Sequence, residues 1–290
     1  MKQTKVLYAA PGAGLGHLNR ALAIGLELRE MGVETRIATN SPFAEGVARL
    51  ARFPVVGIRD WKDGVRAYAE EAQPEVVVCD TFPRGLRGEW AGGLPARGVY
   101  VARRLKAAAL GDVFGGRGWV EGFEQVIAAE ELGAEHEAVI RDSGLPVVRL
   151  PGRVRLRPGL VAAPAPAELE RLLETGRCRL VVHGGPVEEL KRLAELVKGA
   201  GPVAAITPWG QCLEGIPCFE YYPAGNLVGR AARVVSGAGY NIMSDMMNFR
   251  QRHETMPFER RYDDQAGRAG RWGEVEGTAS AAEAIANLVK

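Results

Sequence analysis

The chain has 290 residues, enough for two domains, and its 47% hydrophobic and 25% charged residues are typical of a soluble globular protein. A formal net charge of +2 argues against general nucleic-acid binding, and no apolar run approaches the roughly 20 residues needed to span a bilayer. The apolar stretch at the N-terminus is too short for a signal peptide, and Cys79, Cys178, Cys212 and Cys218 show neither CxxC nor zinc-ligand spacing, which favours a reducing cytoplasm.

Short apolar runs alternate with longer amphipathic stretches through the first half of the chain, a pattern typical of a parallel α/β sheet. Helices are expected over 18–31 and 42–52, the second with Ser41 as its N-cap and Pro42 at its first position. The expected strands are 5–10, 33–39, 55–58, 76–79, 99–102, 125–128 and 147–150.

Residues 146–166 contain five prolines and no helical period, which predicts a connection between domains. After it the alternation resumes, with expected strands at 180–183, 203–206, 218–221, 233–235 and 254–257 and helices at 187–197, 226–232, 240–249, 263–272 and 279–289. Two successive series of this kind predict an α/β protein with two Rossmann-like, doubly wound parallel-sheet domains, 1–155 and 156–290.

A glycine-rich loop containing Gly12, Gly14 and Gly16 joins the first expected strand to the first expected helix. Glycines there permit close approach of backbone to a ligand, although a tight strand-to-helix turn would also explain them. The third glycine of a dinucleotide fingerprint would fall where His17 stands, and Thr39-Asn40 occupies the place of its ribose-binding acid. An imidazole at the carboxyl edge of such a sheet is instead a candidate general base.

Asp80 ends a buried strand, and in a parallel sheet its carboxylate would lie on the same edge as His17. It is a candidate to orient the His17 ring, with capping of the following turn as the alternative. Arg84, Arg103 and Arg104 follow strands at this edge and either meet an anionic acceptor or lie in solvent. We therefore assign Gly14, Gly16, Arg84 and Arg103 to an acceptor-side loop region.

The second half contains a strand that runs into a Ser-Gly-Ala-Gly turn before a helix, an arrangement suited to a diphosphate. Asp245 lies in that helix, where it could accept hydrogen bonds from ribose, and Asp264-Gln265 opens a later helix with polar groups suited to sugar hydroxyls. The expected donor-binding residues are Gly184, Gly185, Ser236, Gly237, Ala238, Gly239, Asn241, Asp245, Asp264 and Gln265.

Three segments carry a family resemblance: Gly-Leu-Gly-His-Leu-Asn-Arg at 14–20, Val-Val-Ser-Gly-Ala-Gly-Tyr-Asn at 234–241, and Arg-Tyr-Asp-Asp-Gln at 261–265. They resemble GT-B glycosyltransferases related to the N-acetylglucosaminyltransferase of peptidoglycan lipid-intermediate synthesis. The similarity is strong over 5–32 and 219–272 and faint between them. The family usually has Glu where Asp245 stands.

The resemblance implies a GT-B fold, with an acceptor-side first domain and a donor-binding second domain facing across a cleft. The turn at 236–239 would face the diphosphate of a UDP-sugar, Asp245 the ribose, and Asp264 and Gln265 the sugar. His17, backed by Asp80, would be the base. The partners would be a nucleotide-sugar donor and an unidentified acceptor.

The chemistry implied is inverting glycosyl transfer by a cytoplasmic enzyme of the cell envelope without metal or cofactor, since no Asp-x-Asp pair is placed for a bridging metal. Peripheral contact with the inner face of the membrane is left open. The alternatives are a nucleotide-sugar hydrolase of the pseudaminic-acid-pathway type, a nucleotide-sugar epimerase, and a non-catalytic nucleotide-sugar-binding protein.

Overall fold

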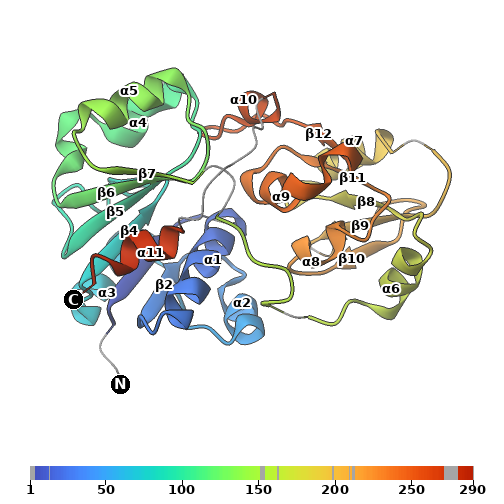
Figure 1. The fold of residues 1–290 in the computed structure, drawn as a ribbon, viewed down its shortest axis with the longest axis horizontal. Coiled ribbons are helices and arrows are strands. Elements are labelled where there is room, and N and C mark those ends of the chain that lie inside the picture. The colour runs from blue at the N-terminus through green and yellow to red at the C-terminus, as the bar shows by residue number, and fades with distance from the viewer. Residues whose placement is uncertain are drawn as a thin grey trace. The chain divides into compact units, whose positions relative to one another are not determined.

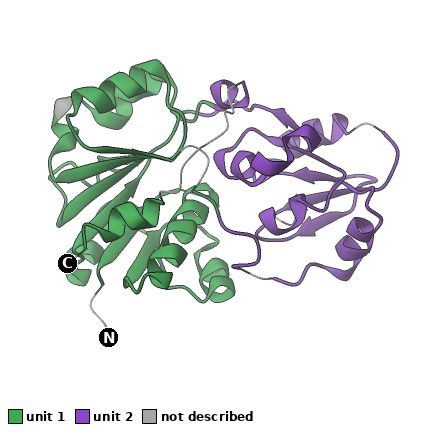
Figure 2. Cartoon of the chain, viewed as in Figure 1, with its two compact units in different colours: residues 1–155, 261–264, 273–290 green, residues 156–260, 265–272 purple. Residues whose placement is uncertain are grey.

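The computed structural model describes residues 4–12, 14–150, 154–161, 163–197, 199–208, 210, 213–270 and 280–289. The chain divides into two compact units, coloured separately in Figure 2. The first unit comprises the described residues within 1–155, 261–264 and 273–290, and the second those within 156–260 and 265–272.

The first unit is built on a seven-stranded parallel sheet with the strand order β3-β2-β1-β4-β5-β6-β7 (Figure 1). The chain moves outward from β1 through β2 and β3 and then returns to place β4 on the other side of β1, which makes the β1–β4 edge a topological switch point. The strands are β1 Val6–Ala10, β2 Thr35–Thr39, β3 Val55–Gly57, β4 Val76–Asp80, β5 Arg97–Ala102, β6 Phe123–Ala128 and β7 Val147–Arg149.

The first unit includes three helices that we did not predict, α3, α4 and α5. Helix α4 has only five residues, and the buried faces of the other two are sparse, formed by Trp61, Val65 and Ala69 in α3 and by His136 and Ile140 in α5. The helices are α1 Gly16–Glu30, α2 Ala44–Ala51, α3 Trp61–Ala72, α4 Leu110–Phe114, α5 Ala134–Asp142 and α11 Ala281–Ala286, with short 3-10 turns at Ala107–Ala109 and Arg117–Val120.

The predicted start of α2 is wrong. The helix begins at Ala44 with Phe43 as its N-cap, and no side chain caps it. The Ser41 hydroxyl donates instead to the carbonyl oxygen of Gly14 (2.9 Å) and so ties the glycine-rich loop to the end of β2.

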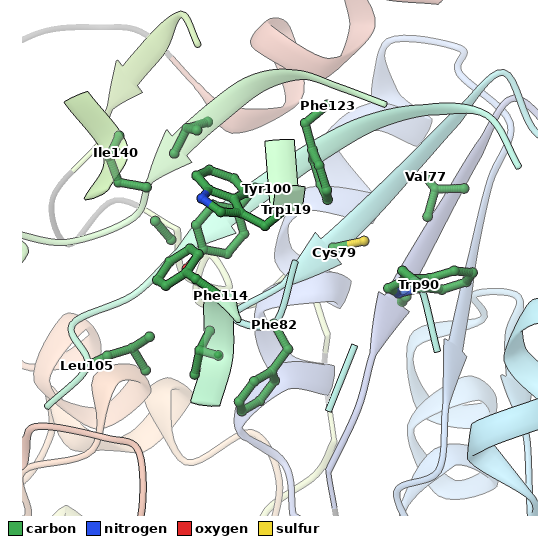
Figure 3. Close-up of a cluster of buried hydrophobic side chains, with 14 of the residues drawn as sticks. Val77, Cys79, Phe82, Trp90, Tyr100, Leu105, Phe114, Trp119, Phe123 and Ile140 are labelled. Carbon is green, nitrogen blue, oxygen red and sulfur yellow. The ribbon is translucent and has the colours of Figure 1, made fainter. Parts of the chain in front are cut away.

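The core of the first unit includes a large cluster of aromatic side chains beside the sheet (Figure 3). Tyr100 of β5 lies at its centre, with the rings of Phe114, Trp119 and Phe123 at centroid distances of 5.8, 5.6 and 6.5 Å. Burial of each large apolar side chain stabilises the fold by roughly 1.5–3 kcal/mol. This packing makes the central strands a rigid base for the residues at their carboxyl ends.

The second unit contains a five-stranded parallel sheet of order β10-β9-β8-β11-β12, whose switch point lies between β8 and β11. The strands are β8 Arg179–Val182, β9 Val203–Thr207, β10 Cys218–Glu220, β11 Arg233–Gly237 and β12 His253–Met256. The helices are α6 Ala167–Glu174, α7 Val187–Glu195, α8 Gly225–Val228, α9 Tyr240–Asp245 and α10 Gln265–Ala269, with a 3-10 segment at Met247–Arg252.

The last two predicted helices differ from the structure. The helix expected over 263–272 is α10, which begins only at Gln265, and residues 271 and 272 lie outside the described chain. The C-terminal helix α11 packs against α1 and belongs to the first unit, not to the second domain to which the sequence assigned it. No helix in the described parts of the chain is both long enough and apolar enough to cross a membrane.

Candidate functional site

Asp80 lies at the end of β4, at the switch point of the first sheet, and its side chain is completely buried. Oδ1 accepts hydrogen bonds from Nη2 of Arg20 (2.7 Å) and from the hydroxyl of Thr81 (2.7 Å). Oδ2 accepts from Nε of Arg20 (3.1 Å) and from the hydroxyl of Tyr8 (3.0 Å). Burial raises the pKa of the Asp80 carboxyl, but the charges and hydrogen bonds of Arg20 and His17 outweigh it and hold the pKa well below its usual range.

His17 is the second residue of α1, and its Nδ1 lies 3.1 Å from Oδ1 of Asp80. Nη2 of Arg20 also lies 3.2 Å from Nδ1, but this guanidinium nitrogen already donates to Oδ1 of Asp80 at 2.7 Å. Because an ionised carboxylate only accepts hydrogen bonds, we assign the Nδ1 proton to the Asp80 contact, which leaves the lone pair on Nε2. Burial lowers the pKa of the His17 imidazole more than Asp80 raises it, and the charges of Arg20 and Arg103 lower it further. The ring is therefore neutral at neutral pH and can accept a proton at Nε2.

The glycine-rich loop is held so that the His17 ring fits against it. Gly12 has a φ of +129°, donates its N–H to Oδ1 of Asn40 (2.7 Å), and would place a Cβ 3.1 Å from Cδ2 of His17. At Gly14 and Gly16 a Cβ would meet no atom of the described chain within 4 Å. Asn40 thus braces the loop from the position where a dinucleotide-binding protein would hold ribose.

Sequence reasoning assigned no role to Arg20, Tyr8 or Thr81. Arg20 is fully buried, and its spacing of three from His17 puts both side chains on one face of α1, a signal that was present in the sequence. Thr81 has a φ of +70°, which is strained for a β-branched residue, and in that conformation its hydroxyl reaches Asp80. Only the fold brings Tyr8 and Thr81 to this carboxylate.

Two of the arginines expected to meet an acceptor are held by carboxylates of the same unit. Arg103 and Arg104 are buried, and each pairs with a carboxylate of the segment 261–264: Arg103 with Asp263, and Nε of Arg104 with Oδ2 of Asp264 at 2.8 Å. Arg103 is thus engaged by Asp263, and its assignment to the acceptor-side region stays a prediction. Arg84 is half-buried, with its guanidinium against Gly115.

The same ion pairs concern Asp264, whose expected contact with the sugar stays a prediction. We predicted that Asp264 would lie in the second domain and face the sugar, but it belongs to the first unit and its carboxylate is held by Arg104. Gln265 does lie in the second unit, where its side-chain oxygen accepts from the backbone N–H of Phe258 (3.0 Å).

The Ser-Gly-Ala-Gly turn lies at the switch point of the second sheet, as does the Gly184–Gly185 loop that follows β8. The Ser236 hydroxyl is buried and is hydrogen-bonded to Nε2 of His253 (2.8 Å) and to the carbonyl oxygen of Gly237 (2.9 Å), so its predicted contact with the donor stays a prediction. Burial lowers the pKa of His253 to about 4. Ala238 is buried, and its carbonyl oxygen accepts from Arg268 (2.9 Å).

Asp245 ends α9, and its carboxylate lies over Gly225 at the start of α8, where a Cβ would fall 2.9 Å from Oδ2. Burial raises the pKa of the neighbouring Tyr222 phenol, and the negative charge of Asp245 raises it further. Asn241 lies one turn earlier in α9 and is half-buried. The two polar side chains predicted for the nucleotide are thus on one short helix beside the switch point.

His183 lies directly after β8 between these loops and was not predicted as a site residue. Its Nε2 lies 2.7 Å from Oε2 of Glu189 in α7, and Arg260 donates to Oε1 of the same carboxylate (2.6 Å). A Cβ at Gly185 would fall 2.4 Å from Nε2, and one at Gly237 would fall 3.3 Å from Nδ1. These glycines therefore make room for the imidazole, a reason that the sequence did not reveal.

The sequence matches no protein-family model and no curated protein. Solved structures do resemble the fold. The Streptomyces sp. SF2575 glycosyltransferase SsfS6, in complex with thymidine diphosphate, aligns with a TM-score of 0.55 at 15% identity over 88% of this chain and 82% of that one.

Two further structures align over similar lengths. The spinosyn forosaminyltransferase SpnP gives a TM-score of 0.55 at 17% identity over 85% of this chain and 78% of that one. A protein described as a UDP-N-acetylglucosamine 2-epimerase, from Listeria monocytogenes, gives 0.54 at 11% identity over 83% and 76%. With its two parallel-sheet units, the chain therefore has the predicted GT-B fold.

Proposed function

We propose that this protein transfers a sugar from a nucleotide-sugar to an acceptor hydroxyl with inversion, and that His17 is the general base. The observation that carries the proposal is the hydrogen-bonded network of His17, Asp80 and Arg20 at the switch point of the first sheet. It holds a neutral imidazole with Nδ1 engaged and Nε2 able to accept a proton.

In the proposed reaction Nε2 of His17 takes the proton of the acceptor hydroxyl as the oxygen attacks the anomeric carbon. The bond from that carbon to the diphosphate breaks, and the nucleoside diphosphate leaves with the electron pair. The imidazolium that forms is stabilised by the Asp80 carboxylate, which stays ionised because Arg20 neutralises it in the buried site. Arg20 is a positioning residue in this scheme, since it acts through Asp80.

We assign donor binding to the second unit. The loops after β8 and β11 meet at its switch point, where ligands bind in doubly wound sheets, and Asp245 and Asn241 lie on the helix that follows β11. Thymidine diphosphate in the SsfS6 structure supports a nucleoside diphosphate as the ligand class. We propose that the backbone at 237–239 faces the diphosphate and Asp245 the ribose.

A nucleotide-sugar epimerase is the second candidate, because the Listeria monocytogenes protein described as a 2-epimerase aligns with a TM-score of 0.54, against 0.55 for SsfS6. The two functions are separated by incubation with a panel of UDP-, dTDP- and GDP-sugars, with and without hydroxyl acceptors. Acceptor-dependent release of nucleotide supports transfer, and release without acceptor indicates a hydrolase. An altered sugar without release indicates an epimerase, and binding without turnover indicates a sugar-binding protein.

A further inference from the structure

His183 occupies a defined position at the assigned donor site. It follows β8, and a side chain at Gly185 on one side or Gly237 on the other would collide with its ring or press closely against it. The residue is 8% exposed, and the ring of Phe258 packs against it at a centroid distance of 5.2 Å. The imidazole is thus held at the point where the two loops of the switch point come together.

One nitrogen of the ring is committed to a carboxylate. Nε2 lies 2.7 Å from Oε2 of Glu189, and Arg260 donates to Oε1 of that carboxylate. Burial raises the Glu189 pKa, but the hydrogen bonds and charges of Arg260 and His183 together lower it by more, so the carboxylate is ionised and Nε2 carries the proton. In the neutral ring the lone pair is then on Nδ1, the nitrogen beside Gly237.

The charges around His183 are balanced while its ring is neutral. Glu189 of α7 contributes one negative charge and Arg260 one positive charge, whereas β11 faces the ring with Gly237. Arg192 of α7 lies over the ring of Phe258, which packs against the His183 ring. Burial and the positive charge of Arg260 together lower the pKa of His183 more than Glu189 raises it, so the ring is neutral at neutral pH. A diphosphate at this switch point would add at least two negative charges and favour the imidazolium.

We propose that His183 takes up a proton when the second unit binds a nucleoside diphosphate group, so that Nδ1–H donates to a phosphate oxygen while Nε2–H remains on Glu189. This inference rests on the proposed donor site. Since a proton is bound together with the ligand, affinity must fall as the pH rises between the pKa of His183 in the free protein and its higher pKa in the complex, by up to about tenfold per pH unit, and become constant above that range.

The test is titration calorimetry of the full-length protein with UDP-glucose, dTDP-glucose and GDP-mannose, in buffers of different ionisation enthalpy, between about pH 5 and pH 8. A nucleotide-sugar is preferred to a free nucleoside diphosphate because each of its phosphates has one ester bond and one anhydride bond and therefore carries no proton that titrates in this range. We expect uptake of up to one proton per bound ligand in the wild type and its loss in His183→Gln. Glu189→Gln, which removes the carboxylate that steadies the imidazolium, should reduce uptake, whereas Glu188→Gln on the same helix should not.

Binding without proton uptake by the wild type would overturn the role of His183 and leave the proposed function standing. The same conclusion would follow if His183→Gln, or Glu189→Gln should the first variant not fold, took up as many protons as the wild type. Failure of all three nucleotide-sugars to bind at any pH would instead overturn the donor site itself, and this inference with it.

Discussion

Each unit has a histidine at the carboxyl edge of its sheet, held by a carboxylate that is in turn held by an arginine. In the first unit these residues are His17, Asp80 and Arg20; in the second they are His183, Glu189 and Arg260. The bonded nitrogen differs, because Asp80 engages Nδ1 and Glu189 engages Nε2. The carboxylates also differ: Asp80 is fully buried with hydroxyl donors in addition, whereas the Glu189 side chain is 17% exposed.

This comparison teaches that the same three residue types can serve two purposes. A buried, fully hydrogen-bonded carboxylate such as Asp80 fixes a ring whose Nε2 is left for proton transfer. A partly exposed carboxylate such as Glu189 leaves its histidine more responsive to an added charge, as expected for an anion-binding position.

The largest expected effect is on turnover, and it distinguishes substitution of His17 from substitution of His183. His17→Ala should reduce turnover by about 10²–10⁴-fold, because it removes the general base, while nucleotide-sugar binding persists. His183→Gln should act mainly on KM, since it removes a donor contact. Steady-state kinetics and calorimetry on both variants make the comparison, and a near wild-type rate for His17→Ala would remove that residue from the mechanism.

The next effect is on stability. From the sequence alone we would expect Asp80→Asn to slow turnover with little loss of thermal stability, but the structure leads to another prediction. The substitution would leave the fully buried Arg20 without its counter-charge, at a cost of about 3–5 kcal/mol in the free energy of unfolding.

Denaturant titration measures this cost. Glu189→Gln, in the more exposed cluster, should lose only about 1–3 kcal/mol, and the double variant Arg20→Met/Asp80→Asn should recover most of the stability lost by Asp80→Asn. Equal losses in the two single variants would show that the environments of the two carboxylates are alike.

The pH dependence of turnover should also distinguish the units. Because burial lowers the pKa of His17, its basic form predominates above a pKa that is less than about 6.5. Hence kcat at saturating donor should rise about tenfold per pH unit at acid pH and become constant above that pKa. Donor affinity should instead fall as the pH rises, because His183 takes up a proton when the donor binds. A pH–rate profile that stays flat through the acid range would be inconsistent with His17 as the base.

Two glycines of one turn distinguish packing from ligand approach. A Cβ at Gly237 would press on His183 and Phe258 at 3.3 Å, whereas one at Gly239 would meet nothing in the described chain within 4 Å. Gly239→Ala should therefore cost less than about 1 kcal/mol of stability yet weaken nucleotide-sugar binding about tenfold if the diphosphate lies there. Unchanged affinity in Gly239→Ala, measured beside Gly237→Ala, would move the diphosphate away from this turn.

The smallest expected effect is that of a chelator. We propose chemistry in which neither histidine binds a metal, so turnover should be unchanged after dialysis against EDTA. Loss of activity that Mg²⁺ restores would contradict this proposal and require a metal at the diphosphate.

Much of the fold could be predicted from the sequence because its signals are local. Apolar runs such as 76–79 mark strands buried on both faces, and their alternation with helical patterns indicates two parallel sheets. The strand ends then placed His17 and Asp80 on one sheet edge, and the structure brings the two side chains together. Among the helices that were not predicted, α3, α5 and α6 have sparse buried faces, and α4 has only five residues.

The tertiary structure decided what no local pattern contains, namely which charges meet. Arg20 and Asp80 are 60 residues apart, and Arg104 and Asp264 are 160 apart, yet each pair is an ion pair within the first unit. Sequence reasoning assigned Asp264 to the sugar, because it could not show that Arg104 lies beside this carboxylate. It assigned no role to His183, because it could not show that Gly185 and Gly237 leave room for the imidazole. Residue type and strand position thus determined the candidate base from the sequence alone, whereas buried charges take partners wherever the packed chain supplies them, and that depends on the whole fold.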